Sequence, residues 1–482
     1  MSDNTLIKGL FWKFSQTLSS QGVTFIISIV LARILLPEEY GIIAIVNVFI
    51  VFSQVFVSDG FSAALIQKKD ADNVDANNMF YCSLAVAVVL YVLLWIFSKK
   101  IAEFFAEPLL SPVIRVYSIC LILNSYNAIQ IAWLSKKLHF KKQFTSTIIA
   151  GIFSGVAGIV IAYNGGGVWA IVVQSLLNIL LNILVLSRIL DWHPTLDFSF
   201  TKAKTLVNYG YKILSSNLLR TTSNEIRQLL IGKYFLVSDL AIYNRGVSFS
   251  SFFYSNITNT ITSVLFPLMS GVNDNPVTIK DIMRKAIKVN SLCLCFFIGL
   301  LAIVAKPLVL ILLTEKWIGC VPYLQISCIS TIIGIISSIN LQALKAIGKS
   351  NVIFRLECFK TPVFLVLLIL SINISLMAVA VSLPIYSFYS AIVNTSPSKK
   401  YFEYSYLSQV KDFIPGVILF IVCGIPSYSL QFILVNQWNI LFAQIAVFTI
   451  LYGTLCIIFK PSGYTILWNK FKSLLLAKSN NY

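Results

Sequence analysis

Long apolar stretches alternate with short polar breaks along almost the whole chain. A helix needs about 20 apolar residues to cross the hydrocarbon core of a bilayer. The pattern therefore predicts an all-α polytopic membrane protein with about fourteen transmembrane helices. The predicted spans are 10–32, 42–66, 79–98, 113–134, 144–163, 168–187, 207–232, 242–271, 286–305, 320–343, 352–371, 374–394, 413–431 and 439–459.

The composition agrees with this pattern. Of the 482 residues, 57% are hydrophobic and 12% are charged, whereas soluble domains carry about 25% charged residues. The connections are short, so no extramembrane catalytic domain is expected, and we predict neither enzyme activity nor a cofactor. The nine cysteines lie mostly in apolar runs and only two histidines are present, so we also predict no metal site.

The net charge of +18 is unevenly distributed. By our count, 25 basic residues lie in connections on the side of the N-terminus. Short loops retain Lys and Arg on the cytoplasmic side. This asymmetry predicts that both termini are cytoplasmic, and it explains most of the basic excess without a nucleic-acid partner. The opposite connections contain six basic residues, which are Arg33, Lys99, Lys100, Lys233, Lys306 and Lys316.

Two segments about 200 residues apart look alike. Arg33 and the acidic pair after it resemble Lys233 followed by Asp239, in each case after a polar first span. We interpret them as parallel six-helix pseudo-repeats around a central cavity, an arrangement common in transporters. Chance similarity between two apolar chains is the alternative. The predicted lobes are 1–195 and 196–400, followed by two additional helices and a cytoplasmic tail at 401–482.

Ionisable residues inside the predicted spans are rare and mostly basic. On a helix with 100° per residue, polar side chains share one face in each of the first two spans of both lobes. Intramembrane charges usually face a bundle interior or a wet cavity, so we expect a cationic cavity that binds an anionic group. The alternative is that these cations only pair with carboxylates and stabilise helix packing, or that the predicted span ends are wrong. The predicted substrate-binding residues are Lys13, Lys212, Arg220, Arg227 and Arg245, against the acids Asp59 and Glu225.

The sequences RILLPEEYG at 33–41 and FVSDGFSAALIQ at 56–67 resemble the opening of Wzx-type polysaccharide flippases, and the teichuronic-acid and colanic-acid exporter-like branch in particular. The segments TEKW at 314–317, VPYLQ at 321–325 and LQALKAIGKS at 341–350 are similar to later parts of that family. The resemblance implies the multidrug/oligosaccharidyl-lipid/polysaccharide exporter fold, whose two lobes enclose a cavity that opens alternately to each side. It also suggests structural or gating roles for Arg33, Glu38, Asp59 and Gly60.

The resemblance further implies the activity. The expected substrate is an undecaprenyl-diphosphate-linked oligosaccharide of O-antigen, capsule or exopolysaccharide, moved to the outer leaflet of the bacterial cytoplasmic (inner) membrane. Proton or ion coupling, with Asp59 or Glu225 as the titrating group, and contact with polysaccharide polymerase machinery are further expectations. Two other classes stay open: a membrane polymerase or ligase, which should carry a sizeable outer loop, and a drug/cation antiporter, which should have acids facing its cavity.

Overall fold

The computed structural model describes residues 3–68, 70–137, 139–272 and 274–479. Helices make up 88% of the chain, and these residues contain no strand, which confirms the all-α class. Within the described ranges, the side chains at 3–15, 18, 59, 63, 67, 203–213, 215–216, 219–220, 223–224, 257, 259–264, 471 and 474–479 are outside the description.

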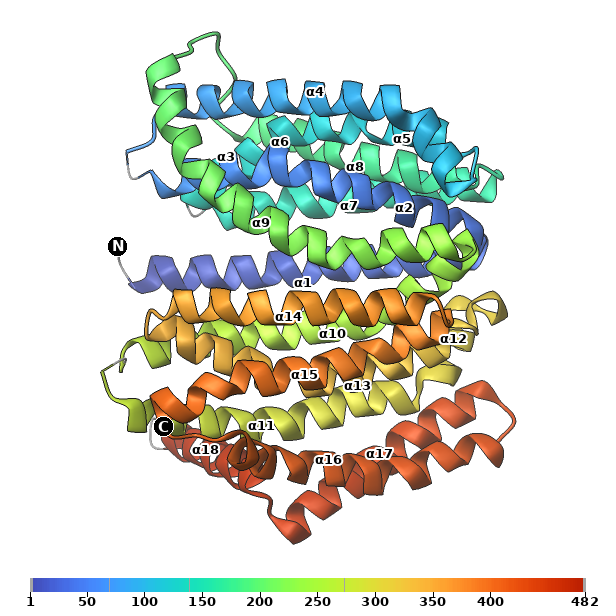
Figure 1. Cartoon of the computed structure of the whole chain (residues 1–482), viewed down its shortest axis with the longest axis vertical. Coiled ribbons are helices and arrows are strands. Elements are labelled where there is room, and N and C mark those ends of the chain that lie inside the picture. Colours follow the sequence, from blue (N-terminus) through green and yellow to red (C-terminus); the bar gives the residue numbers. More distant parts are fainter. Residues whose placement is uncertain (1–2, 69, 138, 273, 480–482) are drawn as a thin grey trace. The chain divides into compact units, whose positions relative to one another are not determined.

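The chain divides into two compact units, Met1–Ala241 and Ile242–Tyr482. In the first unit, long helices run alongside one another (Figure 1). α7 packs against α1 and α8, and α4 packs against α6. The elements of this unit before α10 are α1 (Asp3–Ile34), α2 (Pro37–Gln54), η1 (Val55–Asp59), α3 (Gly60–Gln67), α4 (Asn73–Phe105), α5 (Leu110–Tyr117), α6 (Ile119–Lys136), α7 (Phe140–Tyr163), α8 (Val168–Ile189) and α9 (Phe200–Tyr234).

The second unit holds most of α10 and all later helices. Its core includes a cluster in which Phe448 and Tyr452 of α17 pack with Leu292 of α11, and the Tyr452 hydroxyl donates to the Leu292 carbonyl at 3.0 Å. The last apolar helices therefore pack on this unit. Its elements are α10 (Val237–Ser270), α11 (Pro276–Ile303), α12 (Ala305–Leu313), η2 (Glu315–Trp317), α13 (Cys320–Ala346), α14 (Ser350–Ile372), α15 (Leu376–Phe402), α16 (Tyr406–Ser429), η3 (Leu430–Phe432), α17 (Gln437–Phe459) and α18 (Ser462–Ser479).

Each predicted span overlaps a helix, and most of these helices are longer than the spans; span 113–134 is divided between α5 and α6. α4 has 33 residues, or about 50 Å at 1.5 Å per residue, so its ends extend beyond a hydrocarbon core of about 30 Å. Among the described residues, nine helical segments are long and apolar enough to cross a membrane, and the total of fourteen stays a prediction. Two helices were not expected, α12 and the C-terminal α18, where a tail was predicted.

The 200-residue offset reappears in the helix boundaries. α1 ends at Ile34 and α2 begins at Pro37, while α9 ends at Tyr234 and α10 begins at Val237. The two turns touch each other: a Cβ atom added at Gly41 would lie 1.9 Å from the backbone oxygen of Val237. Only a glycine allows this approach of α2 to the start of α10. The boundaries of the predicted lobes, 195 and 400, stay a prediction, since the unit boundary lies after α9.

Candidate functional site

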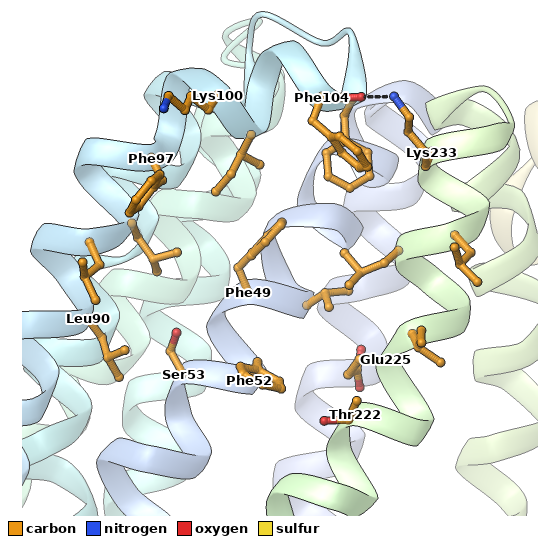
Figure 2. Close-up of a pocket in the computed structure, with 18 of the residues that line it drawn as sticks. Phe49, Phe52, Ser53, Leu90, Phe97, Lys100, Phe104, Thr222, Glu225 and Lys233 are labelled. Atoms are coloured by element: carbon orange, nitrogen blue, oxygen red, sulfur yellow. Dashed lines mark hydrogen bonds between the residues drawn. The ribbon is translucent and has the colours of Figure 1, made fainter. Parts of the chain in front are cut away.

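A cavity of about 970 Å³ lies within the first unit, between α2, α4 and α9 (Figure 2). Its wall is almost entirely apolar, with Phe49 and Phe52 from α2 and Leu90 and Phe97 from α4. The volume is at the upper end of the range of about 300–1,000 Å³ found for ligand pockets. We call this cavity the α4–α9 groove.

The few polar residues of the α4–α9 groove are separated along its length. Thr222 and Glu225 lie together on α9, whereas Lys233 of α9 and Lys100 of α4 lie on opposite sides of the other end, with Phe104 between them (Figure 2). The Glu225 carboxylate accepts a hydrogen bond from the Gln228 side chain at 2.8 Å. The groove therefore has an acidic inner end and a basic mouth.

Lys233 joins α9 to the end of α4. Its ammonium donates to the carbonyl of Phe104 and lies 4.1 Å from the centroid of the Phe104 ring. A cation over an aromatic face is attracted by the negative face of the ring. These contacts fix the last turn of α9 against α4. The Lys100 ammonium lies elsewhere on α4, 5.9 Å from the Phe97 ring centroid.

The structure describes two of the predicted substrate-binding cations. Arg227 of α9 and Arg245 of α10 are half-buried, and the Arg245 guanidinium lies 5.0 Å from the ring centroid of Trp317, which is fully buried. Arg227 does not line the α4–α9 groove, because it follows Glu225 by about 200° around α9. The side chains of Lys13, Lys212 and Arg220 lie outside the described residues.

The three gating or coupling candidates occupy different surroundings. Arg33 is exposed in the last turn of α1, where a cation complements the helix dipole. Asp59 ends the π-helical segment η1, which interrupts the helix from Pro37 to Gln67, and its side chain lies outside the description. Such π-bulges are frequent at functional sites. Glu225 is the candidate that lines a described cavity.

A polar cluster at the start of α4 was missed by the sequence analysis. The fully buried Asp75 carboxylate accepts from the Lys68 ammonium at 2.6 Å and 2.7 Å. Its Oδ2 atom also accepts from the backbone N–H of Asp72 at 3.1 Å, and Asp72 caps α4 in return at 2.8 Å. The Asp-x-x-Asp spacing at the beginning of an apolar run is the signal that could have indicated this capping box.

The same cluster ties the segment before α9 to α4. Asn77 accepts from the Trp192 indole N–H at 3.1 Å and donates to the Thr195 hydroxyl at 2.6 Å. The Lys202 ammonium donates to Asp72 at 2.6 Å. That hydrogen bond is the main reason why the pKa of Asp72 is lowered to about 2. α9 is thus attached to the first unit near both of its ends.

Within the described part of the chain, no group of three or more His, Cys, Asp and Glu residues could hold a metal ion. The nine cysteines are unpaired thiols, and six of them are buried. The site is therefore built from cations, aromatic rings and apolar helix faces.

Comparison with known proteins gives consistent matches. A family model described as "Polysaccharide biosynthesis protein" matches residues 30–322. The chain is 22% identical over 351 residues to the succinoglycan biosynthesis transport protein ExoT of Rhizobium meliloti (strain 1021), which covers 73% of this chain and 71% of ExoT. It is 26% identical over 307 residues to the teichuronic acid biosynthesis protein TuaB of Bacillus subtilis (strain 168), covering 63% of each.

A solved structure shares the fold. The lipid II flippase MurJ, in an inward closed conformation, superimposes with a TM-score of 0.73 at 13% identity, covering 95% of this chain and 99% of MurJ. At this identity the likeness concerns the fold, which is that of a polytopic helical transporter. The predicted exporter fold and the predicted family resemblance are confirmed.

Proposed function

Because this chain belongs to the polysaccharide biosynthesis protein family, we propose that it is a flippase for a lipid-linked oligosaccharide. The substrate is an undecaprenyl-diphosphate-linked repeat unit of O-antigen, capsule or exopolysaccharide. It moves from the cytoplasmic to the outer leaflet of the bacterial cytoplasmic membrane by alternating access. Relatives named as biosynthesis transport proteins and the fold shared with a lipid II flippase support this assignment.

The observation that carries the proposal is the placement of cations on α9 and α10, two helices that the sequence predicts to cross the membrane. Arg227 and Arg245 are half-buried on α9 and α10. An arginine at mid-membrane costs at least about 2.5–3.5 kcal/mol, and such residues mark pathways by default. Binding of a diphosphate offsets this free-energy cost, because a guanidinium presents paired donors that match phosphate oxygens.

Arg227 does not line the α4–α9 groove. Counting 100° per residue, Arg220 and Arg227 lie about 20° apart on α9, and Glu225 lies on the opposite face. We assign the arginine face, with Lys212, to the substrate cavity. Lys13 on α1 joins the same set by its position in the first span, close to the cytoplasmic end.

Trp317 is a positioning residue in this proposal. Its buried ring lies 5.0 Å from the Arg245 guanidinium, and a desolvated cation–π contact contributes about 2 kcal/mol. The ring holds Arg245 in one orientation without contacting the glycan. Diphosphate binding then requires little reorganisation of the arginine.

Energy coupling is assigned to Asp59 or Glu225. A carboxyl group in an apolar wall changes its hydration strongly when it gains or loses a proton, so its protonation can bias one conformation. Glu225→Gln should keep the hydrogen bond with Gln228 but uncouple transport from the proton gradient. Asp59→Asn is the parallel variant, and the coupling group is the one whose neutralisation abolishes gradient-driven transport.

The test uses a bacterial host that lacks its own flippase and therefore its surface polysaccharide. The wild-type chain should restore the polysaccharide, and the double variant Arg220→Ala/Arg227→Ala should not, although it reaches the membrane in equal amount. Arg188→Ala is the matched control, because Arg188 is exposed in the last turn of α8. Full restoration by the double variant would refute the cationic cavity. Restoration of no polysaccharide by the wild-type chain, with drug resistance instead, would favour the antiporter.

A further inference from the structure

The α4–α9 groove opens toward the lipid side of the first unit. In the most apolar stretch of α4, only 11% of the residues are buried. The side chains of Val89, Ile96 and Phe97, for example, are 45–58% exposed. In a membrane-spanning helix, such a surface faces hydrocarbon. The groove between this helix and α9 is therefore accessible to membrane lipids.

The length of the groove matches one leaflet. On α9, Thr222 at the inner end and Lys233 at the mouth are eleven residues apart, or about 16 Å; on α4, Leu90 and Lys100 are about 15 Å apart. Half of the hydrocarbon core measures about 15 Å. Lys100 also lies two residues after the apolar run 79–98 of the sequence. The lysines thus lie at headgroup level when the inner end lies near the midplane.

The charge of the mouth is suited to a phosphate. An ammonium group has three N–H donors, and the Lys233 ammonium gives one of them to the Phe104 carbonyl, which leaves donors for a second acceptor. Lys100 of α4 lies on the other side of the same end, with its ammonium 5.9 Å from the Phe97 ring centroid (Figure 2). Two helices therefore present one cation each above an apolar groove of about 970 Å³.

We propose that the α4–α9 groove is a binding site for an anionic phospholipid of the leaflet that contains Lys100 and Lys233. The phosphate accepts from the Lys233 ammonium, Lys100 adds positive charge from the other side of the groove, and an acyl chain lies along Phe49, Phe52 and Phe97. The chain ends before Thr222 and Glu225. This lipid contacts both α4 and α9 and stabilises their packing. It is distinct from the transported oligosaccharide.

A free anion would use the lysines but leave the apolar groove empty, and a zwitterionic lipid would place its own cation beside them. An anionic lipid satisfies both parts of the groove at once. Each basic residue near an anionic membrane surface contributes about 5-fold in binding. Removal of both lysine charges should therefore weaken retention of the lipid by roughly 20-fold.

The experiment is native mass spectrometry of the full chain released from nanodiscs of phosphatidylglycerol and phosphatidylcholine. The wild-type chain should retain phosphatidylglycerol over phosphatidylcholine, and inorganic phosphate should not displace it. Lys100→Gln/Lys233→Gln should lose this retention by roughly 20-fold, while Lys100→Arg/Lys233→Arg keeps it. Lys99→Gln is the matched control, because Lys99 is an exposed neighbour on α4 that does not line the groove.

A second arm locates the lipid. A phosphatidylglycerol with a diazirine on its acyl chain should label peptides of α2, α4 and α9, and Leu93→Trp, which fills the groove, should abolish that label. Equal retention in the Gln double variant and the Lys99→Gln control overturns the proposal, as does labelling confined to other helices. Displacement by inorganic phosphate would show an anion site without a lipid and would also overturn it.

Discussion

The contact between Gly41 and Val237 gives a sharp prediction, because one methyl group tests it. A Cβ atom at Gly41 would lie 1.9 Å from the Val237 oxygen and 2.6 Å from its carbonyl carbon. Both are backbone atoms, so they cannot rotate away. Gly41→Ala must therefore displace the α2 start from the α10 start by about 1 Å.

The magnitude follows from two opposing effects. Alanine is favoured over glycine inside a helix by about 0.8–1 kcal/mol, whereas forcing a methyl group into a packed contact costs about 1–3 kcal/mol. Gly22 of α1 and Gly453 of α17 are the controls, because nothing lies within 4 Å of a Cβ added at either. Gly22→Ala and Gly453→Ala should gain stability, and Gly41→Ala should fall below both.

The assay is thermal unfolding of the purified full chain in detergent, followed by the loss of monodisperse protein. The gap between Gly41→Ala and the two controls isolates the overpacking cost, which we place near the upper limit of about 3 kcal/mol. At about 2–4 °C per kcal/mol for a unit of this size, the melting temperatures should differ by roughly 6–12 °C. If Gly41→Ala is as stable as Gly22→Ala, Gly41 does not contact the Val237 backbone, and the described packing of the start of α10 on α2 is refuted.

Three further predictions follow from the described contacts. Asp75→Asn should destabilise the chain by about 2–3 kcal/mol. This is less than the cost of about 3–5 kcal/mol for breaking a fully buried ion pair, because the lysine partner is partly exposed. A double-mutant cycle with Lys68→Gln should show coupling in the melting temperatures. The pKa of the Asp72 carboxyl is lowered to about 2 in the folded state, below its ordinary value near 4. The stability that this carboxylate adds is therefore present above pH 4 and is lost as the pH falls toward 2. The melting temperatures of the wild type and Lys202→Gln should differ at pH 6 and converge at acidic pH. Trp317→Leu keeps an apolar side chain but leaves a cavity, so its folding is checked first by the melting temperature. Through loss of the cation–π contact it should lower the affinity of the purified chain for a polyprenyl diphosphate about 10-fold or more; unchanged affinity would contradict the positioning role.

The helices could be predicted from the sequence because each needs only a local signal, an apolar run of membrane length. The first and last residues of the helices could not be predicted, since they depend on capping side chains. α4 begins at Asn73, six residues before the predicted span, because Asp72 and Asp75 satisfy its first N–H groups. α18 was missed because its 18 residues contain no apolar run of membrane length.

The candidate site divides in the same way. Counting 100° per residue puts Glu225 and Arg227 on different faces of α9, and the described cavity is lined by Glu225 and not by Arg227. The predicted cationic cavity stays a prediction. The partners of these residues could not be predicted. Trp317 is 72 positions from Arg245 in the sequence, and Phe104 is far from Lys233, so only the packing of distant helices brings them together.

The most direct test of the account is flipping by the purified chain in proteoliposomes. A fluorescent polyprenyl-diphosphate oligosaccharide is placed in both leaflets, and the fraction accessible to an external periodate reagent is followed with time. The account predicts that the wild-type chain makes the inner pool accessible, and that Arg220→Ala/Arg227→Ala slows this transfer while Arg188→Ala does not. Transfer at the protein-free rate by a folded wild-type chain, or equal transfer by all three chains, would contradict it.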